Sequence, residues 1–382
     1  MTLAPQAFTD WFKLARVHGT GKFFFDKSKF ETTIHQINQA FGERVPSFLL
    51  SYSVKANYFD GLVQSAQAHG VNFECASLHE ITLSLKQGVP PHRITLNTPY
   101  LTPDLVKSCV LQHITINADS LEQLTAIAAE AQRQQKTTDV GVRFNFPEIE
   151  PSRFGIPATQ ENMDAIGALL RTYPQLHVTT LHTHFTGKNK TADVFKRRAQ
   201  AIVEVYQNYF AETTVKCINI GGGFAGNLPD KLAEQLGYQS PEWTGYAAAI
   251  STEFNKLSNK SITLMIEPGM ALVADVFYFV SEVVSIKKVG NKQLALLNTS
   301  TIFLKPTGHH TNLLFEVCNQ EKPTTETTEY ELVGITCRED DVLGNYTGNL
   351  QPGSLVVFKN IGAYTLSFRP DFIFASPEIV TI

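Results

Sequence analysis

The sequence lacks the features that would point to a membrane, export or polyanion-binding protein. No stretch of about 18 uncharged apolar residues, the length needed to span a bilayer, occurs in the 382 residues. The first residues, MTLAPQAFTDWFK, carry an acid and no sustained apolar run, so they do not indicate an export signal. The net charge of −4 disfavours nucleic acid as the main partner. We therefore expect a cytoplasmic protein with neither a membrane nor a nucleic-acid partner.

Cysteine is also scarce, and its pattern disfavours a disulfide framework. The chain has five: Cys75, Cys109, Cys217, Cys318 and Cys337. An odd count without any CxxC pair favours reduced thiols over disulfides or structural zinc. At most one of the five is expected to take part in chemistry.

Eight short segments rich in β-branched and apolar residues recur before Met270: 49–54, 71–76, 93–97, 113–117, 140–145, 178–184, 216–221 and 262–267. Between them lie helix-like segments at 59–70, 78–88, 102–112, 119–134, 161–173 and 193–212. Such alternation over roughly 220 residues predicts an α/β fold of the (β/α)8 TIM-barrel type. Periodicity alone leaves a doubly wound open sheet as the alternative.

Two of the predicted helices have recognisable starting signals. Thr102 precedes Pro103, a combination typical of an N-cap followed by the first helical residue. Asp119 is followed three residues later by Glu122, which suggests a capping pair. We therefore expect one helix to be capped by Thr102 and another by Asp119.

The pattern changes from about Met270 onward. Apolar β-type runs are separated there by turn residues such as Pro352-Gly353, with little helical period. The segment 19–26, GTGKFFFD, could add a strand from the other end of the chain. We predict a barrel over residues 30–270 and a β-sandwich or β-barrel domain built from residues 1–29 together with 271–382.

Chemically useful side chains stand where the predicted strands end, the place where a (β/α)8 barrel collects its active groups. Lys55 follows the first strand, His182 and His184 end the sixth, and Glu267 ends the eighth. A lysine between apolar neighbours is a candidate for a lowered pKa and for imine chemistry. A surface lysine at a strand end would be the ordinary interpretation if Lys55 stood alone.

Two further signals accompany this lysine. Three glycines at 221–223 let backbone N–H groups approach a phosphate closely. Glu267, in the run EPG, would need a cation or a protonated ring nitrogen if it is buried. A lysine for an imine, glycines for a phosphate and an acid for a ring nitrogen are together what pyridoxal 5'-phosphate requires.

The chain resembles the fold-type III pyridoxal-phosphate decarboxylases, the group of ornithine and diaminopimelate decarboxylases with the alanine racemase-like fold. The resemblance covers nearly the whole length and rests on eight motifs in family order: YSVKAN (52–57), FECASLHEI (73–81), SRFGI (152–156), HTHFTG (182–187), GGGF (221–224), EPG (267–269), TCREDD (336–341) and NIGAYT (360–365). It implies a decarboxylase of an L-amino acid that releases an amine and CO2.

The resemblance also implies roles for individual residues. Lys55 would bind the cofactor covalently, His184 would stack on its ring, and Glu267 would pair with the ring nitrogen. Cys337 would donate a proton after CO2 leaves, supplied across the interface of a homodimer with shared active sites. The implied cofactor contacts are Lys55, Glu74, Arg143, His184, Thr186, Gly187, Gly221, Gly222, Gly223, Glu267, Gly269 and Tyr364. Related alanine racemases have an arginine in place of Glu267, so the acid favours decarboxylation.

The sequence departs from the family pattern at the phosphate. The arginine that usually follows EPG is Met270, which cannot hydrogen-bond an anion usefully. The cofactor phosphate must therefore depend on backbone amides or on another cation. Thr186 could replace the usual serine hydroxyl after the histidine, and Glu74 replaces a shorter aspartate.

At Arg338 the sequence also departs from the family pattern, and this difference concerns the substrate. Diamine-forming members have an acid after the catalytic cysteine, whereas an arginine suits a carboxylate or phosphate. We predict an amino acid with an anionic far end, such as a citrate–diamino acid conjugate of siderophore biosynthesis, with ornithine, lysine or diaminopimelate as the alternative. Asp341 would hold the substrate amino group or orient Arg338. A structural ion pair with a neighbouring acid, 339–341, is the other interpretation of Arg338.

Two other classes of protein are also compatible with parts of the sequence, a metal-dependent hydrolase and a catalytically silent regulator. The pair His182 and His184 lies on one face of a strand, as in metal-dependent barrel hydrolases, but no matching later histidines stand at strand ends, so we expect no metal. The departures at Met270 and Arg338 are also compatible with a catalytically silent regulator that binds pyridoxal phosphate. His309 and His310 could contribute at the substrate end.

Overall fold

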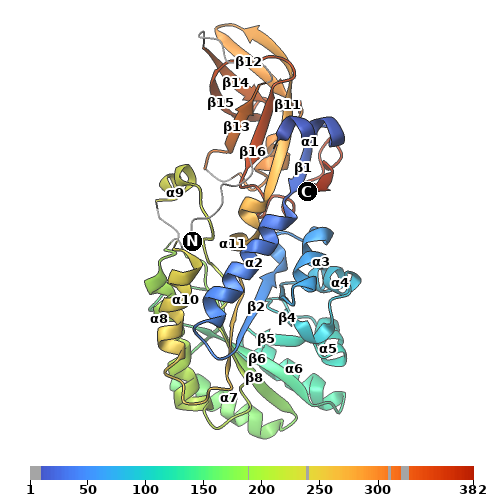
Figure 1. The fold of residues 1–382 in the computed structure, drawn as a ribbon. Helices are drawn as coiled ribbons and strands as arrows, with labels where there is room; N and C mark the ends of the chain where they lie inside the picture. Colours follow the sequence, from blue (N-terminus) through green and yellow to red (C-terminus); the bar gives the residue numbers. More distant parts are fainter. Residues whose placement is uncertain (1–9, 188, 238–240, 309–310, 320–326) are drawn as a thin grey trace. The chain divides into compact units, whose positions relative to one another are not determined.

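The chain divides into two compact units (Figure 1). The computed structural model describes residues 10–187, 189–237, 241–308, 311–319 and 327–382. One unit runs from Lys29 to Val273, and the other combines the N-terminal segment up to Ser28 with Ala274–Ile382.

Eight parallel strands of the first unit close into a barrel. Their order is β5-β4-β3-β2-β10-β9-β8-β6, and β5 pairs with β6 to complete the ring. Closure excludes the open, doubly wound sheet. The strands are β2 (Phe48–Ser53), β3 (Asn72–Cys75), β4 (Ile94–Leu96), β5 (Thr115–Ala118), β6 (Thr138–Asn145), β8 (Leu176–Thr183), β9 (Cys217–Asn219) and β10 (Thr263–Ile266), and the short β7 (Ile156–Pro157) pairs with β6 outside the ring.

Helices surround these strands (Figure 1). The six predicted segments correspond to α3 (Asp60–Ala68), α4 (Leu78–Lys86), α5 (Pro103–Gln112), α6 (Leu121–Arg133), α7 (Gln160–Thr172) and α8 (Ala192–Val205), the last continued by a π-helical turn at Tyr206–Phe210. Three further helices were not predicted: α2 (Lys27–Gly42), α9 (Asp230–Leu236) and α10 (Trp243–Phe254). In α2, buried Phe30, Ile34, Ile37 and Phe41 recur at helical spacing. Burying each such side chain contributes about 1.5–3 kcal/mol.

The two predicted helix starts have different outcomes. Thr102 caps α5 and accepts a hydrogen bond from the Leu105 amide, as expected. The prediction for Asp119 was wrong by one residue, because Ser120 caps α6 and accepts from the Gln123 amide. Asp119 instead accepts from the guanidinium of Arg143, a buried cation that needs an anionic partner.

The second unit is mostly β-structure. Its strands are β1 (Lys22–Phe25), β11 (Phe277–Val289), β12 (Lys292–Leu297), β13 (Leu314–Cys318), β14 (Thr328–Val333), β15 (Val342–Gly348), β16 (Leu355–Lys359) and β17 (Ile379–Thr381), and its described residues also form the short helices α1 (Trp11–His18) and α12 (Thr301–Leu304). The short helix α11 (Met270–Val273) is the last element of the first unit. β1 pairs antiparallel with β11 and parallel with β17, so segment 19–26 does add a strand. Trp11 of α1 packs on Phe24 and Val280 in the core of this unit.

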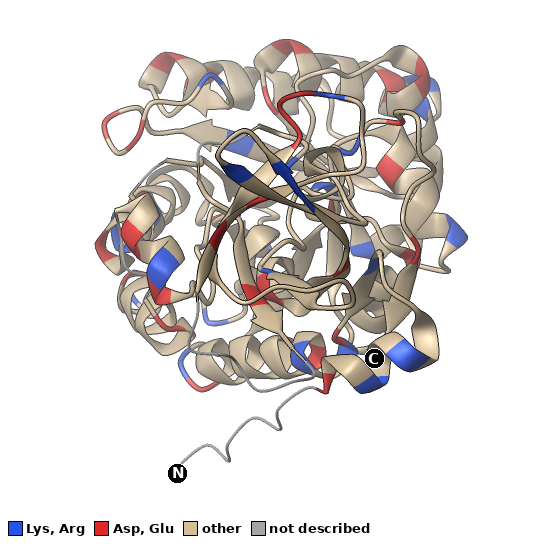
Figure 2. Cartoon of the chain, turned by 90° about the horizontal axis from the view of Figure 1, so that it is seen from above, with Lys and Arg blue, Asp and Glu red and all other residues tan. Residues whose placement is uncertain are grey.

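Charged residues of both signs are interspersed over the helices and loops (Figure 2), in keeping with the small net charge. Among the helices of the described residues, none combines the length and the apolar character that crossing a bilayer would require.

Candidate active site

A cavity of about 400 Å³ lies at the carboxyl ends of the barrel strands. Five of the predicted site residues line it: Lys55, Glu74, Arg143, His184 and Thr186. They come from the ends of β2, β3, β6 and β8 and from the loop after β8. The parallel register therefore brings together side chains that are more than 100 positions apart in the sequence, in a space large enough for a small organic cofactor.

Lys55 lies in the single 3-10 turn Val54–Ala56 that follows β2. Its Nζ is 2.5 Å from Oε2 of Glu74, which is 1% exposed and also accepts a hydrogen bond from the Ser53 hydroxyl. Ser53 and Glu74 are direct partners in the β2–β3 register, so the sheet itself places the carboxylate beside the lysine. The lysine side chain remains about one-third exposed, so a ligand in the cavity can reach its amine.

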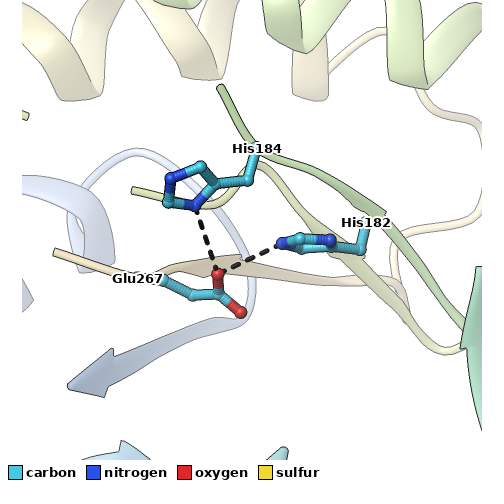
Figure 3. Close-up of side chains that lie close together, drawn as sticks. All are labelled: His182, His184 and Glu267. Atoms are coloured by element: carbon cyan, nitrogen blue, oxygen red, sulfur yellow. Dashed lines mark hydrogen bonds and ion pairs between the residues drawn. The ribbon is translucent and has the colours of Figure 1, made fainter. Parts of the chain in front are cut away.

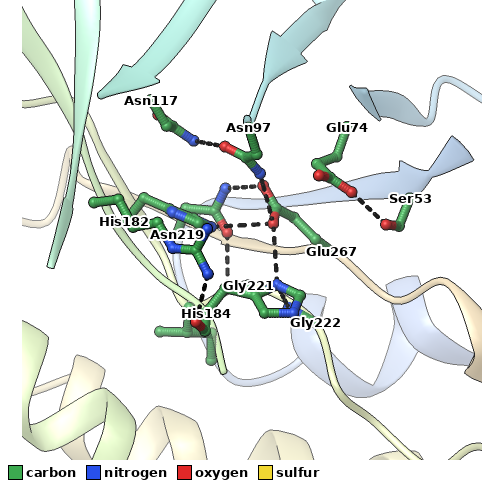
Figure 4. Close-up of polar contacts among 12 residues, drawn as sticks. Ser53, Glu74, Asn97, Asn117, His182, His184, Asn219, Gly221, Gly222 and Glu267 are labelled. Carbon is green, nitrogen blue, oxygen red and sulfur yellow. Dashed lines mark hydrogen bonds and ion pairs between the residues drawn. The ribbon is translucent and has the colours of Figure 1, made fainter. Parts of the chain in front are cut away.

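Glu267 is buried at the end of β10 and is surrounded by hydrogen-bond donors (Figure 4). Its carboxylate accepts from Nδ2 of Asn97 at 3.1 and 3.2 Å and from Nδ2 of Asn219 at 2.6 Å. Nε2 of His182 lies 3.1 Å from it, and because a carboxylate can only accept, this ring nitrogen carries the proton.

Burial alone would raise the pKa of Glu267, but the adjacent His182 and His184 side chains outweigh it and hold that pKa well below its ordinary value. The carboxyl group is therefore an anion at neutral pH. A negative charge held inside a barrel mouth favours a cationic or protonated group in the space next to it.

Three asparagines support this carboxylate, and none of them is among the predicted site residues. Asn97 and Asn219 donate to Glu267, and Asn117 donates to Oδ1 of Asn97 at 2.6 Å. The sequence does carry a signal for them, since an asparagine directly follows a leucine or isoleucine in RITLN, HITIN and KCIN. A polar amide repeated at the ends of neighbouring buried strands indicates a shared network.

His184 is a neutral ring held from two sides. The Gly222 amide donates to its Nδ1 at 3.1 Å, so the proton is on Nε2, which donates to Oγ1 of Thr186 at 3.1 Å. Burial, together with the charges of Lys55 and Arg143, lowers the pKa of His184 to about 3 despite the opposing effect of Glu267. The ring therefore carries no charge at neutral pH.

His182, His184 and Glu267 could also be considered as metal ligands, because one ligand atom from each lies within 4.8 Å of the others (Figure 3). Two of these atoms already have partners. The Gly222 amide donates to Nδ1 of His184, and two asparagine amides donate to the Glu267 carboxylate. The geometry thus fits a hydrogen-bonded cluster. His309 and His310 lie outside the described residues.

Arg143 holds the backbone at His184. It donates to the His184 carbonyl at 2.8 Å and to Asp119 at 3.3 Å, and its guanidinium lies 4.8 Å from the ring centroid of Phe154. Burial lowers the pKa of Arg143 from its usual value. Its contacts make it a positioning residue for the histidine.

The glycines of the predicted phosphate loop follow β9. Gly221 and Gly223 have φ of 68° and 91°, and a Cβ at Gly221 would lie 2.5 Å from the Thr183 carbonyl oxygen, so glycine is required there. Gly269 packs next to the lysine turn, where a Cβ would lie 3.0 Å from Cβ of Ala56. At Gly187 a Cβ would overlap the Glu150 carboxylate.

Four predicted residues belong to the second unit. Cys337 is exposed, and Arg338 forms a two-bond pair with Asp340 at 2.9 and 2.5 Å. Asp341 is buried and accepts from the backbone amides and hydroxyls of Thr301 and Thr336 and from the Ser300 hydroxyl. Tyr364 has φ of 60°, an uncommon conformation for a residue other than glycine and one that recurs at functional sites.

Comparison with known proteins gives a consistent result. The model of the pyridoxal-binding domain of pyridoxal-dependent decarboxylases matches residues 28–274, more than half of the chain. The 2-[(L-alanin-3-ylcarbamoyl)methyl]-2-hydroxybutanedioate decarboxylase of Staphylococcus aureus is 25% identical, with 94% of this chain and 95% of that protein covered. The diaminopimelate decarboxylase of Helicobacter pylori is 23% identical over 94% of this chain and 89% of its own length. The crystal structure of the Helicobacter pylori enzyme with L-lysine has a similar fold, with a TM-score of 0.83 at 19% identity over 98% of this chain and 94% of that one.

Proposed function

The chain belongs to the pyridoxal-dependent decarboxylases, and from this premise we propose that its substrate is an amino acid whose far end carries a carboxylate or another anion. The reaction would remove the α-carboxyl group as CO2 and leave an amine. Arg338, beside the predicted proton donor Cys337, is the observation that carries the choice of substrate.

The cavity fits pyridoxal phosphate, the cofactor of this family. Glu267 is held as an anion, which suits a protonated ring nitrogen, and His184 is neutral, which suits a face of an aromatic ring. Lys55 offers an accessible amine for the aldehyde carbon. When bound, the cofactor supplies an electron-accepting ring that stabilises the negative charge left on the substrate as CO2 departs.

We assign the remaining roles from the surroundings of each residue. Glu267 keeps a proton on the ring nitrogen, supported by its asparagine and histidine donors. Arg143 positions His184, and Glu74 holds the Lys55 amine between turnovers. Cys337 donates the proton that replaces the carboxyl group at the substrate carbon.

Arg338 is suited to bind the anionic end of the substrate. Its pair with Asp340 is exposed to solvent, which screens the attraction between the two charges, so a substrate carboxylate can displace Asp340 at little cost. The name of the Staphylococcus aureus relative describes an alanine unit joined to a hydroxybutanedioate, a dicarboxylate. We infer a similar conjugate here, of the kind used in siderophore assembly. Asp341, whose oxygens already accept from several donors, would hold the turn that carries Cys337 and Arg338.

We expect Arg338→Ala to lower kcat/KM for anionic conjugates by about 10- to 100-fold, because a charged hydrogen bond is lost. Turnover of ornithine, lysine and diaminopimelate should be slow in both proteins. The measurement is CO2 release across this panel, with amine products identified by mass spectrometry. Arg133→Ala, which removes an exposed arginine paired in the same way with Glu130, is the matched control. Robust turnover of a bare diamino acid by the unmodified protein would contradict the proposal.

We also propose a homodimer in which one subunit supplies Lys55 and its partner supplies Cys337. Lys55→Ala and Cys337→Ala should each be nearly inactive, whereas an equal mixture, after subunit exchange, should regain about one quarter of the unmodified activity. One intact site in each mixed dimer accounts for this recovery. If the mixture stays inactive while native mass spectrometry shows mixed dimers, both residues act within one chain.

A silent, cofactor-binding regulator remains the alternative from another class. Lys55, His184, Glu267 and Cys337 are all present, which supports the enzyme, and release of CO2 from any amino acid would exclude the regulator. We further propose a cytoplasmic location, in keeping with five free thiols.

A further inference from the structure

The position after EPG does not provide a cation for the cofactor phosphate, which must be bound by backbone amides or by a cation elsewhere in the chain. Met270 stands there, at the start of the short helix α11. The loop Gly221–Gly223 is the other part of the predicted phosphate site, so we considered which charged side chains adjoin that loop.

Two of the three glycine amides in this loop already donate a hydrogen bond within the protein. The Gly221 amide donates to Oδ1 of Asn219 at 2.9 Å, and the Gly222 amide donates to His184. Within the described residues, the Gly223 amide donates to no other group. It is therefore the one N–H of the three glycines that is available to a phosphate oxygen.

Lys190 lies beside this glycine. It precedes α8, and its backbone is fixed because the Tyr246 hydroxyl donates to its carbonyl at 2.6 Å. A Cβ built on Gly223 would lie 3.9 Å from the Lys190 Nζ. The residue is only 6% exposed, and its ammonium has no hydrogen-bond or ion-pair partner in the part of the chain that the structure describes.

A second buried cation, Arg198, lies next to it. Arg198 donates to the carbonyls of Ile220, Gly222 and Phe185, so its N–H groups fix the two loops while its charge stays without a bonded carboxylate. Burial and then the nearby Arg198 lower the pKa of Lys190 to about 8, with Glu150 opposing. Two adjacent buried cations are costly unless an anion binds beside them.

We propose that Lys190 and the Gly223 amide form the subsite for the cofactor phosphate, with Lys190 supplying the charge that the usual arginine would supply. Arg198 acts as a positioning residue, because it donates to the carbonyls of Ile220 and Gly222 and so fixes the backbone of the loop. The proposal rests on the cofactor of the proposed function. It explains how a chain with Met270 after EPG can hold a phosphate dianion.

The test compares two ligands that differ only in the phosphate. Apoprotein is titrated with pyridoxal phosphate and with pyridoxal, and binding is followed by the visible absorbance of the complex. Lys190→Met, which keeps an unbranched apolar stem, should weaken binding of pyridoxal phosphate by about 10- to 100-fold. Binding of pyridoxal should change by less than about threefold, because the aldehyde end is untouched.

Three further variants keep the result interpretable. Lys196→Met, on the exposed side of α8, should bind both ligands normally. Lys190→Arg should retain most of the phosphate preference, and adding Met270→Arg to Lys190→Met should restore it. Equal binding of pyridoxal phosphate by Lys190→Met and the unmodified protein would overturn the proposal, as would an equal loss for both ligands. Failure of the unmodified apoprotein to bind pyridoxal phosphate would instead refute the proposed function.

Discussion

Replacing Lys55 by alanine is expected to abolish CO2 release and the visible absorbance of the cofactor-loaded protein together. The amine lies in the cavity, and no second lysine lines it among the described residues. Under the proposed function this amine binds the cofactor covalently, so its loss should lower kcat by at least about 1000-fold. The measurements are an absorption spectrum, before and after borohydride, and a CO2 assay on the same preparation.

The control for this variant is Lys86→Ala, which removes an exposed lysine at the end of α4 in the same unit. It should keep the colour, the borohydride response and the rate. If Lys55→Ala retained both chromophore and turnover, the cofactor would be attached elsewhere and the assignment of the site would be wrong. Retained colour without activity would limit Lys55 to a role in proton transfer.

The barrel was predictable because its strands leave a strong local signal. Each barrel strand is a short apolar run bounded by turn residues, and the parallel order follows once helices separate the runs. Closure was not predictable, since it depends on the pairing of the last barrel strand, β10, with the first, β2, in which Leu264 lies opposite Phe48. Periodicity does not reveal whether the last strand meets the first.

The site could be predicted as far as it follows strand ends. Lys55, His184 and Glu267 were predicted in this way, and the asparagines at 97, 117 and 219 stand at or next to strand ends as well. Contacts between distant loops could not be found from spacing. Lys190 lies beside Gly223 because Arg198 of α8 donates to the carbonyls of Ile220 and Gly222 and so holds the helix against the loop after β9. Asp119 does not cap α6 but accepts from the buried Arg143 beside it.

Glu267→Gln is the variant that best separates the charge of this residue from its shape. Glutamine has nearly the same volume and keeps one oxygen to accept from Asn219, so the cavity should persist and the cofactor should still bind. The amide cannot hold a proton on the ring nitrogen as an anion does. Removal of one such preorganised charge typically lowers kcat by about 10²–10³-fold, and we expect a loss of that size with the visible band retained.

The free energy of unfolding of Glu267→Gln provides a second test of the hydrogen bonds around residue 267. The glutamine NH2 group would face Nε2 of His182, which must then accept, moving the ring proton to Nδ1. In the described structure Nδ1 of His182 is buried without a partner, so the variant should lose about 1–3 kcal/mol of folding free energy. Glu253→Gln, a buried glutamate of α10 that pairs with Lys256, is the matched control and should leave kcat unchanged. A Glu267→Gln protein with kcat within about threefold of the unmodified rate would show that the carboxylate charge does not act on the reaction, because a preorganised charge is worth far more than that.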